Sequence, residues 1–157
     1  MKNKIFIIKI DSNMKISKNF TMEEMVKSNT AKRLGINNTP SEEEKRNIIE
    51  LVEKILQPVR NKYGKPIYVN SGFRCEELNK AVGGSKTSQH RYGAAVDIEA
   101  SNGNNTKLFY CIKEMIENGE IEVGQLIWEY GSKKNPNWVH VSLPMPHKKN
   151  QILYLYS

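Results

Sequence analysis

A long apolar stripe on an otherwise charged segment sets the first requirement on the fold. Apolar side chains recur there at three- and four-residue spacing, which predicts a helix with one buried face: Ile48, Val52, Ile55, Leu56 and Val59. Thr39-Pro40-Ser41-Glu42 carries the signals of a helix start, with Thr39 as the cap. Pro58 should kink or divide the helix, because proline removes a backbone donor, and Gly64 should end it.

The order of the other patterns predicts the fold class. A capping box, Thr21-Met22-Glu23-Glu24, predicts a short helix ahead of the long one, and further helices are expected at 76–82 and 106–118. Five segments have the character of strands: 66–70, 93–99, 123–130, 138–143 and 152–156. We expect an α+β fold in which N-terminal helices pack on a small, mostly antiparallel sheet. A single domain should span residues 15–157, after an N-terminal extension at 1–14.

Composition excludes several classes of protein. The chain has 157 residues, of which 38% are hydrophobic, enough for one soluble domain with a core. No stretch could span a bilayer, and the run Ile5–Ile8 is too short for the apolar part of a signal peptide. We therefore expect the protein to be synthesised in the cytosol without such a signal and not to insert into membranes. We also expect it to be a monomer. Cys75 and Cys111 lack the spacing of a metal ribbon or a disulfide framework.

The formal net charge of +7 suits an anionic partner, either nucleic acid or an anionic cell wall. The lysines are scattered along the chain, however, and no nucleic-acid-binding motif accompanies them. We expect no nucleic-acid partner. A basic nucleic-acid-associated protein with incidental histidines is the alternative, and a metal-free, well-folded protein would favour it.

Two segments of the second half carry the strongest chemical signal, because they contain His90, Asp97 and His140. Two imidazoles and one carboxylate are three ligands for Zn²⁺, and a catalytic zinc ion needs three protein ligands and a position for water. Such a water can attack an amide carbonyl. Ser142 shares a strand face with His140, so we expect both to line the site. A loop histidine is nevertheless more often solvated or hydrogen-bonded than a ligand, so residue types leave the question open.

Three motifs, in order along the chain, carry a family resemblance: Ser71-Gly72-Phe73-Arg74, Ser88-x-His90-x-x-Gly93-x-Ala95-x-Asp97 and Trp138-x-His140-x-Ser142. Together they resemble the signature of the zinc D-Ala-D-Ala carboxypeptidase family, which includes bacterial D,D-carboxypeptidases, D,D-dipeptidases of vancomycin resistance and phage endolysins. The resemblance covers residues 15 to about 143. It implies that His90, Asp97 and His140 bind Zn²⁺ and that Arg74 recognises the substrate.

The implied function is zinc-dependent hydrolysis of amide bonds in peptidoglycan stem or cross-linking peptides. The enzyme would be a D-Ala-D-Ala carboxypeptidase or an endolysin-like endopeptidase, and it would act on the cell wall after release, as a phage or prophage product does. Arg74 can pair with a carboxylate or a peptide carbonyl, although a surface ion pair is its alternative role. Together with Arg74, the expected substrate-binding residues are Ser88, Gln89 and Ser142.

The general base is the point at which this sequence departs from the family pattern. Several relatives have Glu, Asp or His three residues before the last zinc-binding histidine, whereas this chain has Asn137, which cannot accept a proton from water near neutral pH. We predict Glu129 as the catalytic base, beside Arg74 in the catalytic set, with Glu99 as the weaker alternative. Asn137 also favours a rival function, a non-catalytic zinc-containing module that binds cell wall or peptide.

Overall fold

A computed structural model describes residues 13–156, so most of the expected N-terminal extension, including Ile5–Ile8, lies outside the described residues. A five-stranded sheet in the order β3-β4-β6-β5-β7 forms the centre of the fold. The strands are β3 (Ile67–Ser71), β4 (Ala95–Ala100), β5 (Gln125–Glu129), β6 (Trp138–Ser142) and β7 (Gln151–Leu155). A small hairpin pairs β1 (Lys15–Ser17) with β2 (Phe20–Thr21).

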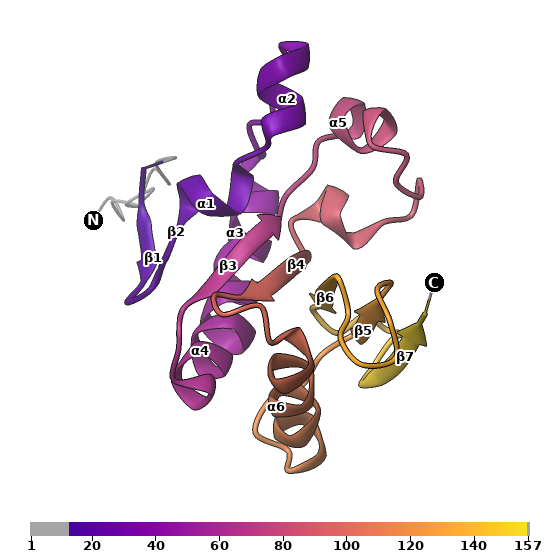
Figure 1. Cartoon of the computed structure of the whole chain (residues 1–157). Coiled ribbons are helices and arrows are strands. Elements are labelled where there is room, and N and C mark those ends of the chain that lie inside the picture. Colours follow the sequence, from indigo (N-terminus) through magenta and orange to yellow (C-terminus); the bar gives the residue numbers. More distant parts are fainter. Residues whose placement is uncertain (1–12, 157) are drawn as a thin grey trace, which may run out of the picture.

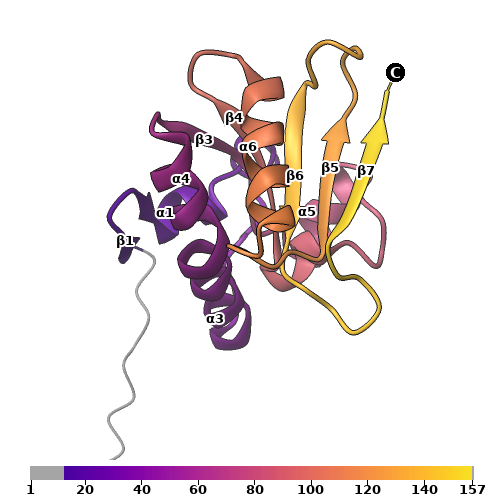
Figure 2. The same ribbon diagram turned by 90° about the horizontal axis from the view of Figure 1, so that it is seen from below.

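The two faces of the sheet have different neighbours. The helices that follow β2 are α1 (Met22–Val26), α2 (Asn29–Leu34), α3 (Glu42–Leu51), α4 (Gln57–Tyr63), α5 (Glu76–Ala81) and α6 (Asn105–Glu117). Figures 1 and 2 show α4 and α6 on one side of the sheet and α5 on the other. The hydrophobic core lies on the α6 side, where the apolar stripe of α3 and α4 meets the sheet. None of the described helices is long and apolar enough to cross a membrane.

Capping boxes mark the starts of two of the helices. Thr21 and Glu24 form the expected capping box of α1. The long helix begins two residues later than predicted, because Ser41 and Glu44 form its capping box and Ser41 is the cap. Thr39 instead donates a hydrogen bond from its hydroxyl to Asn37, so it does not cap the helix.

Pro58 divides the long helix in a specific way. Residues Val52–Leu56 form a π-helical turn between α3 and α4, and Pro58 lies in the first turn of α4. The wider turn accommodates a ring that cannot donate a backbone hydrogen bond. Gly64 then ends α4 with a φ of 77°, a left-handed conformation that glycine adopts without a side-chain clash.

The expected architecture is wrong in two respects. First, the main sheet is mixed, because β5 and β7 pair in parallel whereas the other neighbours are antiparallel. Strand β6 ends beside the start of β5. The 143–150 loop then crosses the start of β5 to its other side, so β7 runs in the same direction as β5. Second, the helices are not gathered at the N-terminus, since α5 and α6 alternate with the strands.

Gly93 provides a test of how tightly the segment before β4 is packed against α3. Its φ is 73°, and an added Cβ would lie 2.6 Å from the carbonyl oxygen of Glu44 and 2.8 Å from Ile48 Cγ1. We expect Gly93→Ala to lower the free energy of unfolding by roughly 2–4 kcal/mol, because backbone strain and a clash add together. Urea denaturation measures this loss.

Gly64→Ala is the matched control, because Gly64 has a φ of 77° but no atom within 4 Å of the added Cβ. It should cost only the strain of a left-handed residue, about 1–2 kcal/mol. Equal losses in the two variants would contradict the packing argument.

Candidate metal centre

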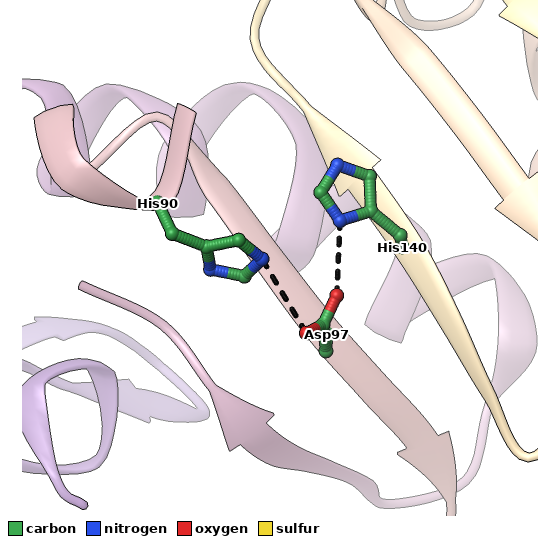
Figure 3. A group of neighbouring side chains, drawn as sticks. All are labelled: His90, Asp97 and His140. Carbon is green, nitrogen blue, oxygen red and sulfur yellow. Dashed lines mark hydrogen bonds and ion pairs between the residues drawn. The ribbon is translucent and has the colours of Figure 1, made fainter. Parts of the chain in front are cut away.

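Three side chains converge on the sheet face opposite the core. His90 lies in a short 3-10 helix, Gln89–Tyr92, whereas Asp97 and His140 are direct cross-strand partners on β4 and β6. His90 Nε2 is 3.3 Å from Asp97 Oδ2, and His140 Nδ1 is 2.9 Å from Asp97 Oδ1 (Figure 3). One potential ligand atom from each residue lies within 4.8 Å of the other two, so the group could hold a metal ion.

The backbone around His90 fixes the orientation of its ring. His90 Nδ1 lies 2.8 Å from the carbonyl oxygen of Gly72, which accepts a hydrogen bond when Nδ1 carries the proton. That tautomer leaves the Nε2 lone pair free toward Asp97, as a metal ligand requires. The backbone N–H of Arg74 donates to the carbonyl of His90 at 3.0 Å. The Gly72–Arg74 segment therefore orients the ring and fixes its backbone.

Asp97 is suited to remain ionised in this environment. Burial would raise the pKa of its carboxyl group, but the hydrogen bond from His140 and the interaction with the neighbouring His90 imidazole outweigh burial and hold that pKa well below its usual range. An ionised carboxylate and two imidazole nitrogens are a donor set that fits Zn²⁺. The residue types and their convergence therefore agree with a zinc site.

A cleft with a volume of about 540 Å³ opens over this group. It brings together all but one of the predicted site residues: Arg74, Ser88, Gln89, His90, Asp97, Glu129 and His140. Ser142 is the exception. It follows His140 on the same face of β6, but its side chain is fully buried and its Oγ accepts a hydrogen bond from the backbone N–H of Gln125. The start of β5 covers Ser142, so its side chain does not line the cleft.

Glu129 lies at the cleft edge beside the metal group. Its Oε1 is 3.7 Å from His140 Nδ1, and its Oε2 accepts a hydrogen bond of 2.7 Å from the indole N–H of Trp138. Burial, and then the negative charge of Asp97, raises the pKa of Glu129 above its ordinary value. A carboxylate with a raised pKa is a stronger base than an exposed one.

The other candidate bases are less well placed. Glu99 accepts a hydrogen bond of 2.7 Å from the side-chain amide of Asn70 and does not line the cleft. Asn137 is exposed and also lies outside the cleft lining. Among the predicted candidates, Glu129 is the carboxylate that lines the cleft beside the metal group.

Arg74 is half-buried at the cleft wall, and its Nε has no hydrogen-bond partner in the described structure. Asn38 supports its loop: the side-chain amide donates to the carbonyl groups of Val26 and Phe73, and its oxygen accepts from the N–H of Cys75. The sequence analysis missed this role of Asn38, because a single loop asparagine carries no periodic signal.

Two further cleft residues also have structural partners. Ser88 Oγ accepts a hydrogen bond from the N–H of His90, and Gln89 donates from its side chain to the carbonyl of Leu143 at 3.0 Å. The side-chain N–H of Gln89 therefore connects the 3-10 helix to the end of β6. The hydroxyl hydrogen of Ser88 remains able to donate to a substrate.

Comparisons with known proteins give two findings. The family described as Peptidase M15 matches residues 18–142. A zinc D-Ala-D-Ala carboxypeptidase of Streptomyces albus G is 50% identical to this chain over 46 residues, which is 29% of this chain and 18% of that protein. The similarity to that relative therefore spans less than a fifth of its length. The family match, in contrast, includes Arg74, Glu129 and all three residues of the candidate metal centre. The chain belongs to the Peptidase M15 family.

Proposed function

We propose that this protein is a zinc-dependent peptidase that hydrolyses amide bonds in peptidoglycan stem or cross-linking peptides. The observation that carries the proposal is the convergence of His90, Asp97 and His140 in a cleft that also contains Glu129 and Arg74. Membership of a peptidase family supports the reaction class. The similarity to a zinc D-Ala-D-Ala carboxypeptidase supports the metal and the kind of substrate.

His90, Asp97 and His140 would hold the zinc ion. When bound, zinc lowers the pKa of a water molecule and polarises a carbonyl group. The chain contributes a preorganised site, because the carbonyl of Gly72 fixes one imidazole and Asp97 orients the other. Ligands that already face one another need little rearrangement on metal binding.

Glu129 is the proposed general base. It would accept a proton from the attacking water and return it to the leaving amine. The indole of Trp138 holds one oxygen of its carboxylate, so the other oxygen, 3.7 Å from His140 Nδ1, is the one placed to exchange the proton. This arrangement compensates for Asn137 at the position where several relatives have an ionisable residue.

Arg74 is the proposed substrate anchor. Its guanidinium group can donate hydrogen bonds to a substrate carboxylate or carbonyl, and Ser88, which also lines the cleft, can donate another. Both exopeptidase and endopeptidase activity fit these roles, and an endolysin-like enzyme acting on the cell wall is included in the proposal. A net charge of +7 would favour a wall with anionic polymers.

A non-catalytic zinc-containing module that binds cell wall or peptide is the second candidate, and the exposed Asn137 favours it. The two functions share the metal centre and differ in whether Glu129 transfers a proton. Turnover therefore separates them, whereas zinc binding does not.

The metal centre is tested by zinc content. We expect His90→Ala and His140→Ala to lose bound zinc, because each removes one of three ligands, and mass spectrometry of dialysed protein measures the metal. His147→Ala is the control, since His147 is exposed and lies outside the cleft. Removal of zinc by a chelator should abolish peptide cleavage, and added zinc should restore it. Full zinc content in both ligand variants would exclude this site.

The base is tested by a pair of carboxamide variants. Glu129→Gln should lower kcat by roughly 100-fold or more, the usual contribution of a general base, while zinc content is unchanged. Glu99→Gln should keep wild-type kcat, because Glu99 lies outside the cleft lining. The reverse pattern would identify Glu99 as the base, and absence of turnover in the zinc-loaded wild type would favour the binding module.

The bond that is cut is tested with purified peptidoglycan. Zinc-loaded protein should release fragments that mass spectrometry can assign: a free terminal amino acid indicates a carboxypeptidase, and separated cross-linked stems indicate an endopeptidase. Glu129→Gln provides the matched inactive protein. Intact peptidoglycan after incubation with the wild type would count against both activities.

A further inference from the structure

Some of the charged side chains that line the cleft have an ion-pair or hydrogen-bond partner in the part of the chain that the structure describes, and others do not. Its charged residues are Arg74, Asp97, Glu129 and Lys148. Asp97 contacts both imidazoles, and Glu129 is hydrogen-bonded to Trp138. Neither Arg74 nor Lys148 has a carboxylate within 4.0 Å among residues 13–156. The cleft therefore presents two cations that form no ion pair with another described residue, and a bound anion would supply a partner.

Lys148 projects from a loop that is well fixed. The loop spans 143–150 between β6 and β7, and within it Met145 and Lys148 exchange two backbone hydrogen bonds of 2.9 and 3.0 Å. Its ends are also bound, since Leu143 N–H donates to Ala94 and Asn150 N–H donates to Val123. A restrained backbone reduces the entropy lost when a side chain on it binds a ligand.

The two successive lysines of this loop have different surroundings. Lys149 forms an ion pair with Glu122 at 3.2 Å and does not line the cleft. Lys148 lines the cleft and is partly buried there. The two lysines are adjacent and of the same type, and they differ in which one faces the cleft and which one has a carboxylate partner.

Lys148 lies toward the opposite end of the cleft from Glu129. Along β5, the residues that line the cleft are Gln125, Ile127 and Glu129, and Ile127 is the cross-strand partner of His140. The loop of Lys148 leads into β7 at Gln151, directly beside Gln125. The metal group therefore lies between Glu129 and the Lys148 end, and two residues along a strand correspond to about 6–7 Å. A peptide one or two residues long spans such a distance.

We infer that Lys148 binds a carboxylate of the substrate peptide, one or two residues from the scissile amide, and so determines specificity for acidic peptides. The inference rests on the proposed function and deepens it. The carboxylate is either the C-terminal group of the peptide or a carboxylate within it, and both have the same chemistry. Lys148 lies outside the three motifs, the last of which ends at Ser142, so the sequence pattern gave no indication of this role.

The test is the kinetics of Lys148→Met on matched peptides. The substrates are a stem peptide with both carboxylates free, its C-terminal amide, and a form in which the internal carboxylate is a carboxamide. On the free peptide we expect KM to rise about tenfold with kcat nearly unchanged, because an interaction common to ground and transition states is removed. One of the two amidated peptides should show no effect of the variant, and that peptide identifies the carboxylate.

Two control variants accompany it. Lys148→Arg should restore most of the affinity because the positive charge is kept, and Lys149→Met should behave as the wild type. Titration calorimetry of the free peptide against each zinc-loaded protein carrying the inactivating Glu129→Gln change gives the same comparison without cleavage, and Lys148→Met should weaken binding by a similar factor.

The outcomes separate this inference from the proposed function. Cleavage and binding by Lys148→Met equal to those of the wild type, or losses of the same size on all three peptides, would overturn the inference and leave the peptidase proposal intact. Binding that depends on Lys148 without any cleavage would support the inference and overturn the peptidase in favour of the binding module. A wild type that neither binds nor cleaves the free peptide would overturn both.

Discussion

The pairing of β4 with β6 is the interaction on which the candidate site depends. It places Asp97 directly opposite His140, at a Nδ1 to Oδ1 distance of 2.9 Å. The register is held from the other face of the sheet, where Val139 and Val141 are fully buried in the core. A slip of one residue would exchange these two faces and remove His140 from the cleft. Burial of apolar side chains therefore positions the polar ones.

A second set of contacts connects the cleft to the N-terminal helices. Gly72 and Arg74 hydrogen-bond to His90, and the N–H of Phe73 donates to the carbonyl of Met25 in α1. Gly93 packs between the His90 segment and α3. Disturbance of these helices should therefore reach the metal group through the backbone, even though no helical side chain from α1 or α3 lines the cleft.

Much of the local structure was predictable because its causes are local. The capping box of α1, the end of α4 at Gly64 and the two strands that carry Asp97 and His140 follow from neighbouring residues. Predictions that needed a distant partner were less successful. The parallel pairing of β7 depends on which side of β5 the 143–150 loop reaches, and the burial of Ser142 depends on Gly124 and Gln125.

The sequence by itself determined the donor types, the motifs of a zinc peptidase family and the alternation that puts His140 on one face of a strand. Only the tertiary structure decided that Glu129 borders the metal group, that Glu99 and Asn137 do not line the cleft, and that Lys148 faces it while Lys149 pairs with Glu122. The physical reason is that residue type and periodicity fix a side chain relative to its own element. The distance between side chains on different elements is set by long-range pairing and by packing of the core.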